Sequence, residues 1–143
     1  MKLSTRSRYG TRMMLDMALH HEGGPVQIGE IARRQGISVK YLEQIIRPLK
    51  AARFVKSVRG PRGGHYLAKP PAEITVGEIV ACLEDGFLLT DCVAHPEACA
   101  RADECLTRAV WGEASRAMLK TLNSITLADL AQRCRSGAET GGV

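Results

Sequence analysis

Apolar residues near the start of the chain recur at the spacing of an amphipathic helix. The i, i+4 and i+8 pattern is formed by Tyr9, Met13, Met14, Met17 and Ala18. Gly23, Gly24 and Pro25 then interrupt the pattern, because glycine and proline disfavour a helix interior. The sequence therefore predicts a first helix that stops at Gly23, with its methionines packed in the core.

Two shorter apolar patterns follow, and a glycine separates them. The first consists of Ile28, Ile31 and Ala32, and the second of Leu42, Ile45, Ile46 and Leu49. Gly36 lies between them and can adopt the positive φ of a tight turn, so the segment predicts a helix-turn-helix. A plain helical hairpin in a bundle is the alternative. Ser38 is expected to cap the second helix, and Pro48 should kink that helix near Arg47 unless tertiary packing holds it.

The side of this second helix that faces away from the apolar stripe carries polar residues. They are Lys40, Glu43, Gln44 and Arg47. Glu43 can accept a hydrogen bond from a cytosine amino group and Gln44 can pair with adenine, whereas Lys40 and Arg47 suit phosphates. We expect these four residues and Tyr41 to contact DNA.

The segment FVKSVRGPRGGHYLAKP predicts a β-hairpin directly after the helix-turn-helix. Val55 and Val58 lie on one side of a Gly/Pro turn, and Tyr66 and Leu67 lie on the other. Such a hairpin is the wing of a winged helix. Its tip holds Arg59 and Arg62 among glycines, which favours contacts to phosphates or to the minor groove.

The second half of the chain predicts three more helices. Capping boxes open the first and the last of them, at Thr75 with Glu78 and at Thr126 with Asp129. The middle helix carries an apolar stripe at alternating steps of three and four residues: Leu106, Val110, Ala114, Ala117, Met118, Leu122 and Ile125. This spacing is typical of a helix–helix seam, and a second copy of the chain is its simplest partner.

These elements define a mostly α-helical protein. We expect a winged helix-turn-helix DNA-binding domain over residues 1–80. Residues 81–134 are expected to form a cysteine-rich cluster loop and a long dimerisation helix, and residues 135–143 a flexible tail.

Charge separates the same two halves. Residues 1–70 hold 14 lysines and arginines against 4 acids, a net charge of +10, whereas residues 71–143 hold 6 against 11, a net charge of −5. This asymmetry favours a nucleic-acid-binding domain joined to a part with another role, although a solvated charged surface is the alternative. We find no paired acid and base, no nucleophile motif and no phosphate loop, so we do not expect an enzyme.

The stretch CVAHPEACARADEC places three of the five cysteines, Cys92, Cys99 and Cys105, in one polar loop. The start of the chain has no apolar h-region and no later stretch is long and apolar enough to span a membrane, so we expect a cytoplasmic protein without a membrane segment. An odd number of cysteines there favours metal binding or thiol chemistry over disulfides. Cys82 and Cys134 are instead predicted on apolar helical faces.

Five ordered blocks resemble bacterial winged-helix transcription regulators of the IscR type, a family that also includes NsrR and CymR. The blocks are MKLSTRSRYGTRMMLDMALH, KYLEQI, SVRGPRGGHYLAKP, ITVGEIV, and CLTRAVW followed by NSITLADL. The resemblance covers residues 1–134 and implies a homodimer that binds double-stranded operator DNA. It also implies base reading by Glu43, Gln44 and Arg59, and a 2Fe-2S cluster held by Cys92, Cys99 and Cys105.

The fourth cluster ligand has no obvious counterpart here. IscR-like proteins have a histidine three residues after the last cysteine, where this chain has Arg108, and NsrR-like proteins use an acid on the first helix, where it has Arg8. The candidates within the loop are His95, Asp103 and Glu104, and a residue from the partner's first helix is another. A cluster-free thiol switch or a zinc site is the alternative use of these cysteines.

Overall fold

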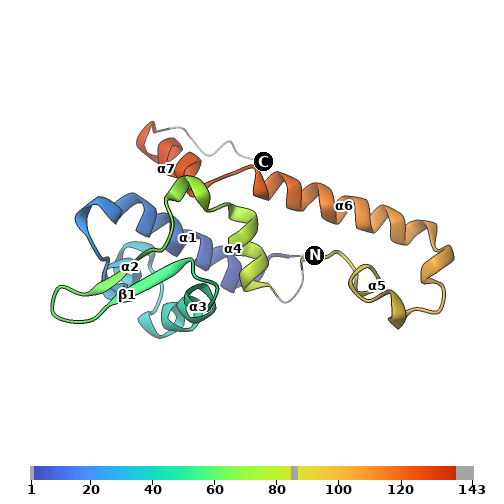
Figure 1. Cartoon of the computed structure of the whole chain (residues 1–143), viewed down its shortest axis with the longest axis horizontal. Coiled ribbons are helices and arrows are strands. Elements are labelled where there is room, and N and C mark those ends of the chain that lie inside the picture. The colour runs from blue at the N-terminus through green and yellow to red at the C-terminus, as the bar shows by residue number, and fades with distance from the viewer. Residues whose placement is uncertain (1, 85–86, 138–143) are drawn as a thin grey trace.

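The computed structural model describes residues 2–84 and 87–137, and Figure 1 shows an irregular body from which a long helix extends. The body begins with helix α1 (Thr5–His20), which Ser4 caps by accepting a hydrogen bond from the backbone N–H of Ser7. The first helix is therefore confirmed, with a short 3-10 turn over His21–Gly23 at its end. Its three methionines, Met13, Met14 and Met17, are fully buried.

Helices α2 (Ile28–Gln35) and α3 (Val39–Ala51) form the predicted helix-turn-helix. Gly36 between them has a φ of 64°, in the left-handed region that glycine adopts readily. Ser38 caps α3 through its hydroxyl, which accepts from the backbone N–H of Tyr41 at 3.2 Å. Helix α3 continues through Pro48, and the fully buried Leu49 beside it anchors that turn in the core.

Strands β1 (Val55–Val58) and β2 (Gly64–Leu67) pair antiparallel, with Val55 opposite Leu67 and Val58 opposite Gly64. The other edge of β2 is joined to the segment before α2, because the backbones of Val26 and His65 exchange hydrogen bonds of 2.7 and 2.8 Å. The hairpin is thus attached to the helix-turn-helix, and together they form the winged helix expected from the sequence.

Helix α4 (Val76–Leu83) packs against α1 and α3, and helix α6 (Leu106–Asn123) extends away from the body beyond it. The base of α6 is fixed to the start of α4, where the N–H of Val76 donates to the carbonyl of Ile125 at 2.8 Å. Figure 1 shows the short helix α5 (Asp91–Ala94) near the far end of α6. The structure thus places the cysteine loop away from the winged helix.

Helix α7 (Leu127–Arg135) returns to the body and packs against α1. Among the described residues of α7, Leu127 and Ala131 are buried, whereas Cys134 in the last turn is exposed. By its spacing Cys134 continues the face of α7 that carries Leu127 and Ala131, but the last turn of the helix extends beyond the core, so the thiol is exposed there. Cys82 of α4, in contrast, is half-buried and packs against the core.

The predicted flexible tail is only partly covered by the structure. Arg135 belongs to α7, and residues 138–143 lie outside the described residues. Among the helices that the structure describes, none combines the length and apolar character needed to cross a membrane.

Candidate nucleic-acid interface and cysteine loop

The outward face of α3 is polar and exposed. Lys40, Glu43, Gln44 and Arg47 all lie on it, while Leu42, Ile45, Ile46 and Leu49 on the opposite face are buried. Within the described residues, the four outward side chains have no hydrogen bond or ion pair with the rest of the chain. Lys50, one turn after Arg47, is exposed as well and extends the basic face. Sequence reasoning did not select Lys50, although its distance of three residues from Arg47 could have indicated it.

Tyr41 differs from these four residues. It is half-buried and packs edge-on against Tyr9 of α1, with 5.9 Å between the ring centroids. This contact fixes α3 on α1, so the ring faces the protein for part of its surface. A DNA contact by Tyr41 stays a prediction.

The wing tip is a tight turn with two exposed arginines. Gly60 has a φ of 113°, and its carbonyl accepts a hydrogen bond from the N–H of Gly63 at 2.9 Å. A side chain at Gly63 would collide with the carbonyl of Val58, so the turn depends on that glycine. Arg59 and Arg62 are exposed on this turn. Their guanidinium groups are thus carried on a compact, well-defined loop.

A polar network holds the helix-turn-helix on α1. The buried carboxylate of Asp16 accepts hydrogen bonds from Arg34 and from Gln35 at the end of α2. Arg12 of α1 donates in turn to the side chain of Gln35 at 3.1 Å and to its backbone carbonyl at 2.6 Å. The turn before α3 is therefore fixed from two successive turns of α1.

The cysteine loop is ordered as a series of short turns. Cys92 lies in α5, Cys99 follows a 3-10 turn over Pro96–Ala98, and Cys105 follows another over Ala102–Glu104 and precedes α6. All three thiols are partly exposed. The loop thus presents its cysteines to solvent at the far end of α6.

The structure does not bring these thiols together with other ligands. Cys92 and Cys105 each contact a neighbouring hydroxyl, that of Thr90 and that of Thr107, both at 3.3 Å. Over residues 2–84 and 87–137, no three histidine, cysteine or acidic side chains are grouped closely enough to hold a metal. His95 instead pairs with the exposed Glu97, at 3.2 Å. A shared site would therefore need the loop to change conformation.

The surroundings of Cys105 and Cys82 shift the pKa values of their thiols in opposite directions. The pKa of the Cys105 thiol is lowered, first by a hydrogen bond from the Thr107 hydroxyl and next by the backbone N–H of Arg108. Burial raises the pKa of the Cys82 thiol, which lies against the core. Thiolate chemistry is therefore favoured at Cys105 and disfavoured at Cys82.

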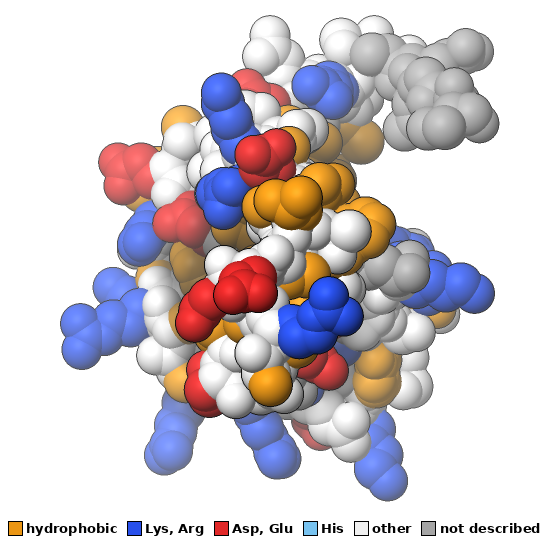
Figure 2. Space-filling view, turned by 90° about the vertical axis from the view of Figure 1, so that its right-hand side faces the viewer, with side chains coloured by type: hydrophobic (Ala, Val, Ile, Leu, Met, Phe, Trp, Pro, Cys, Tyr) orange, Lys and Arg blue, Asp and Glu red, His pale blue; other side chains and the backbone are white. Residues whose placement is uncertain are grey.

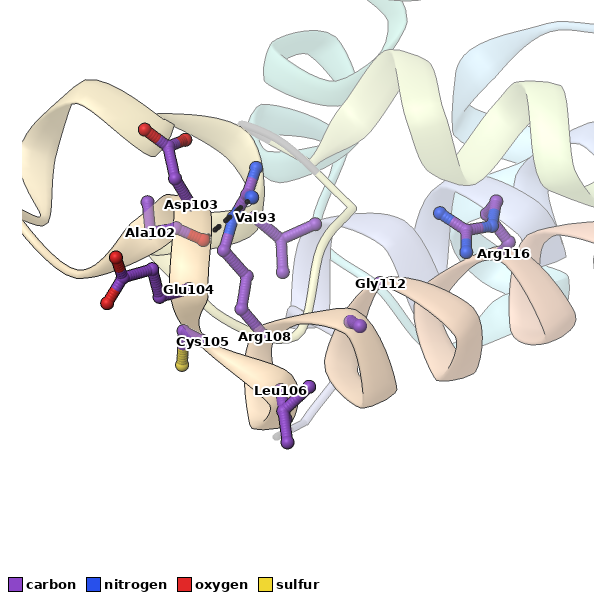
Figure 3. A pocket seen from close by; sticks show the side chains of 10 residues that line it. Val93, Ala102, Asp103, Glu104, Cys105, Leu106, Arg108, Gly112 and Arg116 are labelled. Carbon is purple, nitrogen blue, oxygen red and sulfur yellow. Dashed lines mark hydrogen bonds between the residues drawn. The ribbon is translucent and has the colours of Figure 1, made fainter.

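Arginines occupy both positions at which the family resemblance would place the fourth cluster ligand, and each of them makes other hydrogen bonds. Arg8 is exposed on α1, and one of its guanidinium nitrogens donates to the hydroxyl of Thr5 at 3.3 Å. Arg108 donates to two backbone carbonyls of the loop, and it lines a cavity of about 550 Å³ beside Cys105 (Figure 3). Asp103 and Glu104 also line this cavity.

Apolar side chains are exposed along α6. Leu106 is 85% exposed and Val110 54% exposed, although both belong to the predicted seam. Figure 2 views the molecule from the right-hand side of Figure 1, where α5 and the start of α6 lie, and shows apolar side chains gathered among charged ones. Nearer the body, Met118 and Leu122 border an apolar hollow of about 420 Å³ with Leu3 and Phe87. A surface of this kind is characteristic of an interaction site.

Comparisons with known proteins agree with this architecture. Residues 3–133 match the family model Rrf2, described as an iron-dependent transcriptional regulator. The Rrf2 protein of Nitratidesulfovibrio vulgaris is 52% identical over 130 residues, covering 91% of this chain and 87% of that protein. The regulator IscR of Serratia proteamaculans is 42% identical over 130 residues, covering 91% of this chain and 79% of IscR.

Solved structures give the same result. The structure of T. potens IscR superposes with a TM-score of 0.80 at 39% identity, covering 99% of this chain and 94% of that one. The structure of CymR, described as the global cysteine regulator of B. subtilis, has a TM-score of 0.77 at 36% identity, covering 92% and 97%. These relatives are regulators of transcription, and the chain belongs to the Rrf2 family of winged-helix transcriptional regulators, with IscR-type architecture.

Proposed function

We propose that the protein is a homodimeric regulator that binds specific operator sequences in double-stranded DNA. The observation that carries this proposal is the outward face of α3, whose polar side chains have no partners within the described chain. Helix α3 would lie in the major groove, with Glu43 and Gln44 at base edges and Lys40 and Arg47 at phosphates. Arg59 would enter the minor groove and Arg62 would contact the backbone. Such a regulator acts in the cytoplasm, where DNA is present and thiols stay reduced.

A second copy of the chain is the proposed partner of α6. Its exposed Leu106 and Val110, and the apolar hollow beside Met118, offer the apolar surface that a helix–helix interface buries. Two copies related by a two-fold axis would present two α3 helices to the DNA. The operator should then contain two half-sites about one helical turn, or a multiple of one turn, apart.

Sedimentation and salt-dependent DNA binding test this proposal together. The operator is first selected in vitro from random duplexes, and affinity is then measured between about 50 and 200 mM salt, where phosphate contacts are steeply weakened. Arg47→Ala should lower the salt dependence by the equivalent of one phosphate contact per subunit. Lys120→Ala on α6 is the matched control and should not change it. A monomer whose binding does not depend on salt would contradict the proposal.

We also propose that Cys92, Cys99 and Cys105 hold a 2Fe-2S cluster through which the regulator senses iron–sulfur or redox status. Three partly exposed thiols in one loop, one of them with a lowered pKa, are a suitable donor set, because thiolates are the usual ligands of such clusters. A bound cluster would supply a charge and geometry that change with its oxidation state.

Four candidates could supply the fourth ligand. Three of these candidates, His95, Asp103 and Glu104, lie within the loop. The other candidate is a residue of the partner subunit's first helix. Arg108 is excluded because a guanidinium stays protonated and has no lone pair to offer.

The iron content of anaerobically purified protein tests the cluster. Alanine at any of the three loop cysteines should abolish visible absorbance and bound iron while the fold is retained. Cys134→Ala is the matched control, because that thiol is exposed but lies on α7 outside the loop. Full iron content in Cys99→Ala would remove Cys99 from the ligand set.

A cluster-free thiol or zinc regulator of the same fold is the second candidate. It is favoured by the separate contacts of Cys92 and Cys105, each of which bonds to a neighbouring hydroxyl and not to a shared centre. Protein that contains no iron, yet changes its DNA affinity when its thiols are oxidised or when zinc is added, would support this candidate over the cluster.

A further inference from the structure

The side chain of Arg108 connects three parts of the cysteine loop. Arg108 lies in the first turn of α6, and its Nε donates to the backbone carbonyl of Cys92 in α5 at 2.8 Å. Its Nη1 donates to the carbonyl of Ala102 at 3.3 Å, which is the dashed line in Figure 3. One guanidinium therefore joins α5 and the Ala102–Glu104 turn to the start of α6.

The loop has few other contacts that could fix its shape. Within its described residues, 87–105, only Ala102 is buried. Its backbone hydrogen bonds are local, such as those from His95 to Asp91 and from Ala102 to Cys99. A bond of 3.0 Å from the N–H of Leu89 to the hydroxyl of Ser115 ties the beginning of the loop to α6. Helix α5 also packs on α6, with Val93 beside Gly112. Arg108 supplies the remaining side-chain hydrogen bonds from α6 to the loop backbone.

Arginine suits this role for chemical reasons. Its planar guanidinium offers several donors in a fixed geometry and stays charged at every pH at which the protein is folded. A lysine carries its charge on a single nitrogen and cannot match the same fork to two carbonyls. In Figure 3 the guanidinium of Arg108 extends to Ala102, whereas the thiol of Cys105 points away from it. The side chain thus acts on the loop backbone.

We infer that Arg108 is a positioning residue that closes the cysteine loop and fixes Cys92 relative to Cys105 in protein without bound metal. The two carbonyls that it binds are 10 residues apart in the sequence, and the described contacts include no other side chain that joins them. Loss of the guanidinium should therefore open the loop locally while the winged helix stays folded. This inference concerns the loop that the proposed function uses, but it depends on neither DNA binding nor iron.

Residue-resolved alkylation of reduced, metal-free, full-length protein tests the inference. A pulse of iodoacetamide is followed by peptide mass spectrometry, which measures the modification rate at each cysteine. In Arg108→Ala the rate at Cys92 should rise about tenfold, because the closed state loses two charge-assisted hydrogen bonds. Cys82 packs against the core, so its unchanged rate will show that the protein has not unfolded globally.

Two further variants separate geometry from charge. Arg108→Lys keeps the charge but not the fork, so the rate at Cys92 should rise nearly as much as in Arg108→Ala. Arg116→Ala is the matched control, because Arg116 lines the same cavity from the same helix but makes no hydrogen bond to the described part of the loop. An unchanged Cys92 rate in Arg108→Ala, or wild-type behaviour of Arg108→Lys, would overturn the inference.

Discussion

The carboxylate of Asp16 and the guanidinium of Arg34 form a buried ion pair between α1 and α2, with 2.6 Å between Oδ1 and Nη2. Arg34 also donates to both carboxylate oxygens through Nε. Asp16 is 2% exposed and Arg34 24% exposed, so little water reaches the pair. Because Arg34 precedes the turn at Gly36, this pair holds the end of α2 on α1 next to the turn that leads into α3.

Removing the acid should destabilise the protein strongly. Asp16→Ala leaves the charge of Arg34 without its partner in a partly buried site, and we expect a loss of about 3 kcal/mol in the free energy of unfolding. Urea denaturation measures it. Arg33→Gln is the control, because Arg33 pairs with Glu30 on the exposed surface and does not contact Asp16, so its loss should cost less than about 1 kcal/mol. Equal losses in both variants would show that burial does not matter here.

The same pair should make stability depend on pH. Burial alone would raise the pKa of Asp16, but the hydrogen bonds from Arg34 and Gln35 outweigh it, so the pKa in the folded state is lowered. The stabilisation is therefore present above the unfolded-state pKa, about 4, and is lost as the pH falls through the lower folded-state value. Between about pH 7 and 2.5, the melting temperature of Asp16→Asn should fall less steeply than that of the wild-type protein. Parallel curves for the two proteins would contradict this.

Features decided within one turn of the chain were predictable from the sequence. Ser38, Thr75 and Thr126 cap their helices as expected, each accepting from the N–H three residues ahead. Gly36 takes the left-handed conformation that its place between two apolar patterns indicated. These predictions are confirmed because caps and tight turns depend on immediate neighbours.

Contacts between distant segments were not predictable in this way. Asp16 lies inside an apolar stripe, and nothing in its neighbourhood indicates that Arg34, 18 residues away, will neutralise it. Arg108 could be excluded as a ligand from its chemistry, but its bonds to two loop carbonyls depend on how α5 folds back. Clustering of cysteines in sequence likewise did not place their thiols around one point.

Gly10 should be required for the packing of α4. A Cβ at this position would lie 2.2 Å from Cδ1 of Leu83 and 3.2 Å from Cγ2 of Ile45, both in the core. Gly10→Ala should therefore cost about 1 to 3 kcal/mol of stability, despite the better helix propensity of alanine. In a parallel urea titration, Gly29→Ala on α2 should be neutral or stabilising, since no atom lies within 4 Å of its added methyl. Equal effects of the two substitutions would remove the packing argument.

Arg59 should contribute to affinity according to the sequence that flanks each half-site. The wing holds it exposed on a tight turn, and a narrow A·T-rich minor groove has the deepest negative potential for a guanidinium. Arg59→Ala should weaken binding to A·T-rich flanks by about 1 to 3 kcal/mol and affect G·C-rich flanks less. Fluorescence anisotropy on matched duplexes measures this difference. Equal losses on all flanks would reduce Arg59 to a phosphate contact.

Glu43 should act by excluding wrong sequences. It is an acid on an exposed face shared with Lys40, Arg47 and Lys50, where its charge opposes the approach of phosphates. Such a residue is useful only if it accepts from a cytosine amino group at the right site and repels acceptors elsewhere. Glu43→Ala should therefore keep or raise overall affinity while reducing the discrimination among bases at one position by about 1 to 3 kcal/mol.

A library of single-base operator variants measures this discrimination for wild type and Glu43→Ala. Gln44→Ala is the matched comparison, because it removes an uncharged reading group from the same face and should lower affinity for the preferred operator. The two substitutions should therefore differ in outcome. Glu43→Ala should reduce specificity without reducing affinity, whereas Gln44→Ala should reduce both. If Glu43→Ala kept the wild-type preference at every position, the carboxylate would be a surface charge that takes no part in reading DNA.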